Sequence, residues 1–438
     1  MSSALFAWIR WLTSSLILPI LDSLELLMPG TSLTALDEKL VSDEFLDDPY
    51  PILRQLRREE PVYWSESIGG WILTRYDDIV PTFKDVAHFS NYGRFAKAVE
   101  YLPPEGRKKL APFENHYRQK NLLQSDPPDH TRLRTLVVKA FNATSIDAMR
   151  PMIKKIVNDV IDMVEPRGQM DVIRDLAFPL PFSILGSIMG VPNTDQDSVK
   201  FWADELLAFQ GVNRPPQAVL ERSQAALLAM RSYLTDLVNE KRRRPAEDLI
   251  SQLVAVEAEG TKLTEQELVS TCVQMLGAGH ETTTSLIGNG LYLILSHPQQ
   301  WQKLRQIPSL LNSAIEEILR YESPVARQPR LIRGDVELGG KKMLDGQVAF
   351  QMLNAANRDP DHFLDPDTFD IERQNNRHIA FGMGIHFCLG AGLARAEAQE
   401  VFKAIMERLP NIRLVSEKPV WDRHKPNSRM LHSLHVTF

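Results

Sequence analysis

The sequence predicts a mainly α-helical protein with a minor β component, an α+β fold class. Helical periodicity dominates from about residue 125 to 321, short β signals lie on both sides of it, and strands do not alternate with helices as in βαβ folds. After residue 30 we find no internal repeat, low-complexity tract or long Gly/Ser linker. We therefore assign residues 31–438 to one large domain and residues 1–30 to an N-terminal apolar extension.

The N-terminal extension has the pattern of an amphipathic helix. Apolar residues recur every three or four positions between Leu5 and Leu16, but Arg10 interrupts the stretch and Pro19 would break a helix. The run is therefore shorter than the ~20 residues that span a bilayer, and it lacks the cleavage site of a secretory signal. Two roles remain open for residues 4–28: packing on the protein's own core, or peripheral contact with a membrane. We expect a cytoplasmic protein in either case.

The β signals lie towards the two ends of the chain. A hairpin is predicted around Gly69 and Gly70, which separate PVYWSES from GWILTRY. A second β region spans residues 329–353, and short strands return at SLHVTF near the C-terminus. These segments are expected to form a small β-rich part beside the larger helix-rich part.

The longest helix is predicted over residues 263–298. Thr264 and Glu267 have the spacing of a capping box, and Pro298 ends the helix. Gly277 and Gly279 lie in mid-helix, although each glycine there costs about 1 kcal/mol relative to alanine. We expect a reason for their presence, such as close approach to a ligand or a local opening of the helix.

Composition excludes several classes of protein. The 43% apolar and 24% charged residues are typical of a globular chain, which rules out a disordered or fibrous one. The net charge of −6, from 50 basic and 56 acidic residues, argues against a nucleic-acid protein held by a positive field. The two cysteines, Cys272 and Cys388, are too few for a disulfide framework or a structural zinc site. We expect Cys272, on the long helix, to be inert core.

The loop that leads to Cys388 is the strongest candidate site. A helical pattern begins at Leu389, so Cys388 directly precedes a helix N-terminus, whose N–H groups and partial positive charge stabilise a thiolate. Gly382 and Gly384 allow the backbone to approach a flat ligand. This arrangement favours a thiolate-ligated metal cofactor. For a cysteine considered alone, a buried apolar role is the more common alternative.

Residues 381–390 follow the pattern F-x-x-G-x-H-x-C-x-G, which resembles the haem-binding loop of the cytochrome P-450 family in its soluble bacterial branch. Five residue types stand at fixed spacing directly before a helix. Two nearby positions depart from the branch: Met383 replaces its usual histidine and Gly392 its usual proline. Neither departure affects the cysteine.

Further segments resemble the family in its own order, over roughly residues 45–438, and imply its fold. The string AGHETT, residues 278–283, is similar to the central helix over the haem. DPPDHTRLRTLVVKAF, residues 126–141, is similar to a helix that binds haem propionates. Glu317 and Arg320 resemble a structural Glu-x-x-Arg pair. Its third partner is usually an arginine where this chain has Thr368, and whether Arg373 replaces it stays open.

The resemblance implies haem b (iron protoporphyrin IX) as cofactor, with Cys388 as the axial thiolate ligand of the iron. The implied propionate contacts are His130, Arg134, Arg330 and His386. The other implied haem contacts are Phe381, Gly384, Gly390 and Ala278.

The activity implied by the resemblance is that of a haem-thiolate monooxygenase, which inserts one oxygen atom of dioxygen into a small organic substrate by hydroxylation or epoxidation. Glu281 and Thr282 match the family's acid–alcohol pair, which delivers protons to bound dioxygen. In the alternative, the Thr282 hydroxyl bonds to its own helix. A catalytically silent haem-binding or scaffold protein, and peroxide-driven or dehydratase chemistry on the same fold, are the rival functions.

By family correspondence, the substrate pocket is expected to draw on Arg94, Phe95, Leu276, Val325, Arg327 and Met430. Because pocket walls are usually apolar, Arg327 suggests a polar or anionic substrate, unless it points to solvent or to a propionate.

The sequence contains no flavin or nicotinamide motif, so electrons are expected from a separate ferredoxin or flavodoxin with its NAD(P)H reductase. A basic face that would steer an acidic ferredoxin is suggested by Arg132, Lys139, Arg373, Arg377 and Arg395. We expect a monomer that binds no nucleic acid.

Overall fold

The computed structural model describes residues 35–141, 143–212, 214–256 and 263–438. The predicted N-terminal extension, including residues 4–28 with their two open roles, lies outside the described residues. Within the described ranges, no helix is both long enough and apolar enough to cross a bilayer.

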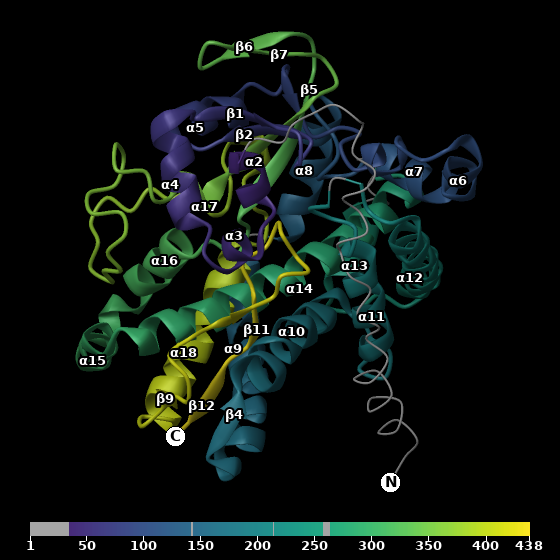
Figure 1. The fold of residues 1–438 in the computed structure, drawn as a ribbon. Coiled ribbons are helices and arrows are strands. Elements are labelled where there is room, and N and C mark those ends of the chain that lie inside the picture. Colours follow the sequence, from purple (N-terminus) through teal and green to yellow (C-terminus); the bar gives the residue numbers. More distant parts are fainter. Residues whose placement is uncertain (1–34, 142, 213, 257–262) are drawn as a thin grey trace.

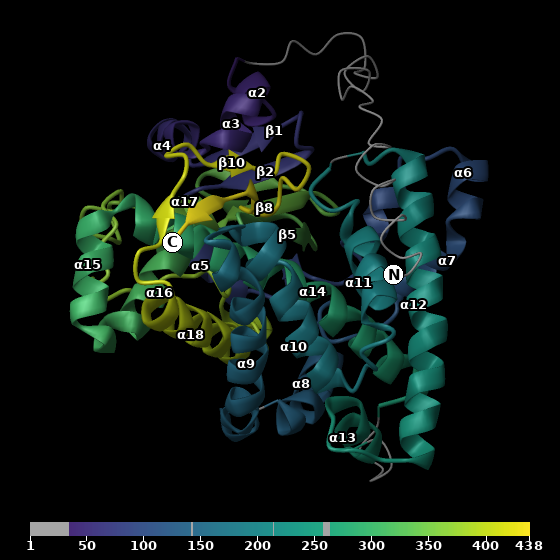
Figure 2. The same cartoon turned by 90° about the horizontal axis from the view of Figure 1, so that it is seen from below.

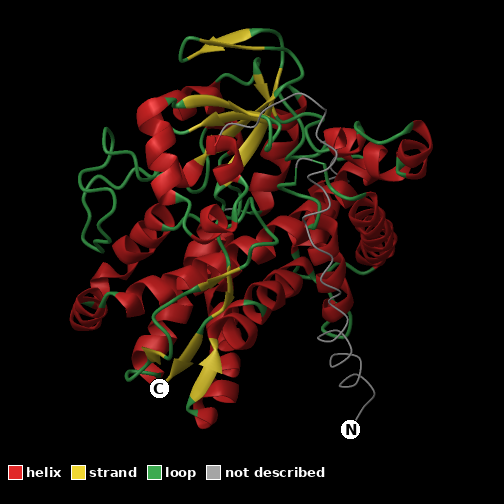
Figure 3. Ribbon diagram, viewed as in Figure 1, coloured by secondary structure: helices red, strands yellow, loops and turns green. Residues whose placement is uncertain are grey.

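Helices make up most of the described chain (Figure 3). In chain order the α-helices are α2 (Ala35–Leu40), α3 (Asp43–Asp47), α4 (Tyr50–Glu59), α5 (Tyr76–Lys84), α6 (Pro104–Lys109), α7 (Ala111–Arg118), α8 (Asp129–Ala140), α9 (Ala143–Val164), α10 (Pro179–Met189), α11 (Gln196–Leu207), α12 (Gln217–Arg243), α13 (Leu249–Val256), α14 (Glu265–Ser296), α15 (Pro298–Gln306), α16 (Leu311–Tyr321), α17 (Leu353–Ala356) and α18 (Ala391–Arg408).

The strands are short. They are β1 (Val62–Ser65), β2 (Gly70–Leu73), β3 (Phe89–Ser90), β4 (Gln169–Asp171), β5 (Arg327–Ile332), β6 (Val336–Leu338), β7 (Lys341–Met343), β8 (Val348–Met352), β9 (Arg413–Leu414), β10 (Val420–Trp421), β11 (Leu431–Ser433) and β12 (His435–Thr437). This content confirms the predicted mainly α class with a minor β component.

The largest sheet has five strands in the order β1-β2-β8-β5-β3. The predicted hairpin is its edge, where β1 and β2 pair antiparallel from Val62 opposite Leu73 to Ser65 opposite Gly70. Strand β2 pairs with β8 in parallel, and the remaining pairings are antiparallel. Figure 1 shows this sheet at one end of the molecule, with α4 and α5 close to it and most of the helices at the other end.

Helix α14 runs through the middle of the molecule, with α18 on one side and α11 and α12 on the other (Figures 1 and 2). Its first residue follows Thr264, whose side chain forms the predicted capping box with Glu267. The helix is continuous, so the opening expected near its glycines is not found. Instead, a Cβ at Gly279 would lie 2.8 Å from Leu185 of α10, and one at Gly290 would lie 2.8 Å from Phe402 of α18. These glycines are needed for close helix packing.

Candidate functional site

The Cys388 loop is ordered by its own backbone. The Cys388 N–H donates to the Phe381 carbonyl at 3.0 Å, and Gly390 is the N-cap of α18, two residues later than the sequence indicates. Burial raises the pKa of the Cys388 thiol, while the N–H groups of Gly390 and Ala391 and the charge of Arg134 lower it. The N–H donors expected for a thiolate are therefore in place. By contrast Cys272 is fully buried, and burial raises its pKa to about 12.

Gly384 adopts a φ of +67°, and a Cβ there would lie 2.6 Å from the carbonyl oxygen of Phe83 in α5. The sequence predicts that this glycine admits a flat ligand. In the structure, the backbone of α5 lies against this glycine. A side chain at position 384 would therefore push the cysteine loop away from α5.

Glu316 anchors the loop from the opposite side. Its carboxylate accepts two hydrogen bonds from Arg395 of α18, at 2.7 and 2.8 Å, and lies 3.0 Å from His378 Nε2. The Arg395 guanidinium lies over the Phe381 ring, 4.5 Å from its centroid. Burial alone would raise the pKa of Glu316, but Arg395 and His378 outweigh it and hold that pKa at about 2.

Glu317 and Arg320 form an ion pair at 2.7 Å in which both side chains are fully buried. This burial distinguishes the pair from the solvated surface ion pairs that are common at this helical spacing. Arg373 Nε lies 3.1 Å from both carboxylate oxygens of Glu317. Arg373 therefore occupies the place of the arginine that is missing at Thr368, and Thr368 contributes its carbonyl oxygen to Arg320 and Arg373.

The four predicted propionate-binding residues come together near Cys388. The rings of His130 and His386 lie 4.1 Å apart, and the charges of His130, Arg330 and Arg134 all act on His386. Burial, followed by Arg134, lowers the pKa of His130 to about 4. Burial, followed by the neighbouring basic groups, lowers that of His386 to about 2. Within the described ranges, no hydrogen-bond partner is found for either ring nitrogen of His130 or for Nε2 of His386, all of which are buried.

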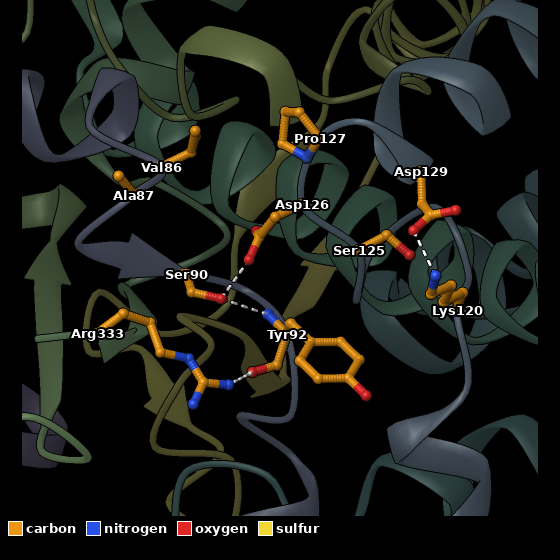
Figure 4. Close-up of a pocket in the computed structure, with 10 residues that line it drawn as sticks. All are labelled: Val86, Ala87, Ser90, Tyr92, Lys120, Ser125, Asp126, Pro127, Asp129 and Arg333. Atoms are coloured by element: carbon orange, nitrogen blue, oxygen red, sulfur yellow. Dashed lines mark hydrogen bonds and ion pairs between the residues drawn. The ribbon is translucent and has the colours of Figure 1, made fainter.

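Asp126 is the acidic side chain beside this group, but its oxygens are engaged. It accepts hydrogen bonds from Ser90 Oγ and from the Asn91 N–H, at the wall of a cavity of about 440 Å³ (Figure 4). Figure 4 shows Asp126 and Ser90 facing each other across this wall, with Lys120 paired to Asp129 nearby.

These observations fit a haem. Buried nitrogens without partners are costly unless an acceptor satisfies them, and two carboxylates on a planar ring would supply acceptors. The same ring would bring a metal to the cysteine sulfur.

One face of α14 borders open space. Ala278 is exposed and Thr282, four residues on, is half-buried, whereas most of the helix is buried. The Thr282 hydroxyl donates to the Ala278 carbonyl at 3.1 Å, which is the alternative that the sequence analysis kept open. Thr283, Thr284 and Ser285 do the same with their own preceding turns. The bond leaves the lone pairs of Thr282 Oγ1 available to a donor.

Glu281 is held by the C-terminal loop. Lys425 Nζ lies 3.0 Å from its Oε2, and Ser428 Oγ donates to its Oε1 at 2.6 Å. The Lys425 side chain is 28% exposed and the Glu281 side chain 14% exposed, so the pair is largely buried. Sequence reasoning missed Lys425 and Ser428, because polar loop residues carry no spacing signal for a partner so distant in the chain.

The structure places the predicted substrate residues in different surroundings. Leu276 is fully buried and Met430 nearly so, which places Leu276 in the packed core and not on a pocket wall. Phe95 packs edge-on against Tyr117 and Phe209. Val325 forms an isolated β-bridge with Ser428.

The guanidinium of Arg327 is held by oxygen atoms from two loops. Its guanidinium donates to Asn427 Oδ1 at 2.8 Å and to the Gly211 carbonyl at 2.9 Å, and burial lowers its pKa to about 10. It points neither to solvent nor to the basic group near Cys388. Two of its five N–H donors are therefore engaged by protein atoms, and an anionic substrate stays a prediction.

A family model for cytochrome P450 matches residues 90–433. The chain is also 39% identical to "Cytochrome P450 107B1" of Saccharopolyspora erythraea over 378 residues, which span 85% of this chain and 91% of the relative. The chain belongs to the cytochrome P450 family.

Other proteins similar to this P450 are also cytochromes P450. It is 38% identical to the "Biotin biosynthesis cytochrome P450" of Bacillus subtilis over 401 residues, covering 91% of this chain and 98% of the relative. The crystal structure of P450BioI with an acyl carrier protein carrying hexadec-9Z-enoic acid has a TM-score of 0.81 at 36% identity, covering 91% and 100% of the two chains. That of CYP109E1 from Bacillus megaterium with testosterone has a TM-score of 0.81 at 32% identity, covering 90% and 99%.

Family membership establishes the class of reaction. The P450 is a haem-thiolate monooxygenase that uses dioxygen, an organic substrate and electrons from a redox partner. The silent-scaffold alternative is not favoured.

Proposed function

We propose that Cys388 ligates the haem iron, that His130, Arg134, Arg330 and His386 hold the propionates, and that Glu281 and Thr282 handle protons on the opposite side. The observation that carries this proposal is the group of buried, unpartnered nitrogens beside Cys388. When bound, haem activates dioxygen and supplies the oxygen atom that enters the substrate.

On the side of Cys388, backbone N–H groups and the Phe381 contacts fix the position of the sulfur and reduce its charge. The N–H groups of Gly390 and Ala391 approach the sulfur and reduce the charge that it presents. Phe381 accepts the Cys388 N–H through its carbonyl, and its ring lies beneath Arg395. These contacts keep the sulfur in one position without a cysteine partner.

On the α14 side, the proton route begins at Lys425. This ammonium group belongs to a partly exposed side chain and contacts Glu281 Oε2. We infer that a proton passes from solvent to the Glu281 carboxylate, and from there through water to Thr282 Oγ1. The Thr282 oxygen accepts a hydrogen bond from that water, and the hydroxyl turns away from the Ala278 carbonyl to pass on its own proton as it takes up the incoming one.

A mainly apolar substrate fits the side chains around the predicted pocket. Phe95 is a partly buried apolar side chain at the predicted pocket, and it packs against the buried core rings of Tyr117 and Phe209. Asn427 and Gly211 engage two of the five N–H donors of Arg327, whose charge suggested an anion. The structures of relatives with hexadec-9Z-enoic acid on a carrier protein and with testosterone support substrates with a large apolar body.

Spectral titration of the haem tests the substrate class. We expect long-chain fatty acids or steroids to shift the Soret band of the wild type, and small polar acids to leave it unchanged. The Arg327→Met variant should keep the same order of preference. Selective loss of binding to carboxylic acids in this variant would restore the anion-binding role.

For the redox partner we propose the outer face of α8. A groove there is lined by Pro127, Pro128, Thr131, Arg132, Thr135, Leu136 and Lys139. Phe387, next to Cys388, is 42% exposed. Arg373 does not belong to this surface, because its side chain is 10% exposed and pairs with Glu317. We expect Lys139→Glu to slow electron transfer from an acidic ferredoxin and to weaken its salt dependence.

The reaction itself is tested with isotopically labelled dioxygen. A monooxygenase places one labelled oxygen atom in each product molecule and requires the redox partner. Unlabelled product would indicate dehydratase chemistry, and product formed with peroxide alone at the same rate would indicate a peroxide-driven enzyme.

A further inference from the structure

The guanidinium of Arg94, which the sequence placed in the substrate pocket, contacts strand β5 beside Arg330. Its Nη1 donates to the Pro329 carbonyl at 2.8 Å, and Nη1 of Arg330 donates to the same oxygen at 3.0 Å. Two guanidinium groups therefore share a single acceptor. Arg94 also lies over the Phe95 ring, 4.5 Å from its centroid, which fixes its direction.

This arrangement brings like charges together. Burial, followed by the charge of Arg330, lowers the pKa of Arg94 to about 9, and burial lowers that of Arg330 to about 10. Arg94 also acts on His386, together with His130 and Arg134. Asp126 is the nearby acid for both arginines, but Ser90 and Asn91 already bond to it.

Arg94 also has a donor to spare. Its Nε is buried without a hydrogen-bond partner, as are Nε2 of His386 and both ring nitrogens of His130. An anion placed among these nitrogens would satisfy the donors and relieve the repulsion between the arginines.

We propose that Arg94 is a fifth haem-anchoring residue, which binds a propionate carboxylate jointly with Arg330. The inference rests on the proposed function, in which this group of residues holds the haem. It moves Arg94 from the substrate pocket to the cofactor site. It also gives the loop that contains Arg94 and Phe95 a direct tie to the haem.

Haem transfer from the purified holoenzyme to apomyoglobin tests the proposal. We expect Arg94→Met to lose haem about tenfold faster than the wild type or more, because a charge-assisted bond is removed. Arg94→Lys keeps the charge and should lie between the two. Lys97→Met is the matched control, because Lys97 is on the same loop but donates to the Gly346 carbonyl. Its haem loss should equal that of the wild type.

The midpoint potential of the haem gives a second readout. Removing a cation near the propionates disfavours the reduced iron, so the potential of Arg94→Met should fall, while that of Lys97→Met should not change. If Arg94→Met does not fold, the same comparison is made with Arg94→Lys, whose haem loss must exceed that of the wild type.

The proposal is overturned if Arg94 variants lose haem at the wild-type rate and keep its potential. Weaker binding of carboxylate substrates alone would return Arg94 to the substrate pocket. A failure of the proposed function looks different, because the wild type itself would then lack the thiolate-type spectrum of the reduced carbonyl complex.

Discussion

The Nζ atom of Lys425 lies 3.0 Å from Oε2 of Glu281, although 144 residues separate them in the chain. Ser428 holds the other carboxylate oxygen at 2.6 Å. Burial opposes the charge on Lys425, but Glu281 and Asp204 outweigh it and raise its pKa. The acid on α14 is therefore positioned by the C-terminal loop, which couples proton handling to a segment outside the helix.

Lys425→Met should leave the haem spectrum intact but lower the share of electrons that reach product. Without its cation, the Glu281 carboxylate is free to turn, and protons arrive less reliably. The measurement is product formed and peroxide released per NAD(P)H consumed. Lys342→Met is the control, because Lys342 pairs with Asp335 on the β6–β7 hairpin. Equal coupling in both variants would remove Lys425 from the proton route.

Thr282→Ala should retain haem and lose reducing equivalents as peroxide, with product per electron falling on the order of tenfold or more. The neighbouring Thr283→Ala variant is a close control. Thr283 also donates to its own helix, at 3.4 Å, but it is buried. If the two variants uncouple to the same extent, the effect arises from the helix and not from the hydroxyl that faces the open space.

The buried pair of Glu317 and Arg320 should dominate stability near the cysteine loop. Glu317→Gln leaves Arg320 and Arg373 without their charge partner, so we expect a loss of about 3–5 kcal/mol in the free energy of unfolding. Arg373→Met should lose less, about 1–3 kcal/mol, because Arg320 remains. Denaturant unfolding of the holoenzyme measures both. Lys155→Met, which removes an exposed pair with Asp159, should change stability by under about 1 kcal/mol.

The acid stability of the enzyme should depend on Glu316. Its pKa in the folded state is about 2, against the usual 4.5, so the folded state binds fewer protons. The contribution is therefore present above about pH 4.5 and is lost as the pH falls towards 2. It amounts to roughly 3 kcal/mol at most.

Glu316→Gln should accordingly be less stable than the wild type at pH 6, with the difference shrinking as the pH falls through 4. Unfolding midpoints across this range measure it. Glu372→Gln removes an exposed pair with Lys303, and its curve of unfolding midpoint against pH should run parallel to that of the wild type. A parallel curve for Glu316→Gln would show that its ion pair does not stabilise the loop.

Local signals in the sequence predict local structure well. The start of α14 follows from Thr264 and Glu267, which are close in the chain and satisfy each other's hydrogen bonds. The cysteine loop is equally local, since its glycines, its histidine and the helix N-terminus fall within ten residues. The four propionate candidates were found through resemblance, and the structure brings them together.

Long-range partners could not be predicted in the same way. Arg94 and Pro329 are 235 residues apart, and no pattern around Arg94 indicates that its guanidinium turns towards Arg330. The partners of Arg327 could not be predicted for the same reason, because Gly211 and Asn427 come from distant loops. The glycines of α14 correctly indicated that another group lies close to the helix. At Gly279 that group is Leu185 of the neighbouring helix α10 and not a ligand.

The most direct test of the account is the absorption spectrum of the reduced carbonyl complex, recorded for the wild type, Cys388→Ala and Cys272→Ala. We predict a thiolate-type Soret band in the wild type and in Cys272→Ala, and its loss in Cys388→Ala. A wild type without this band, or a Cys388→Ala variant that keeps it, would contradict the assignment of Cys388 as the ligand of the haem iron.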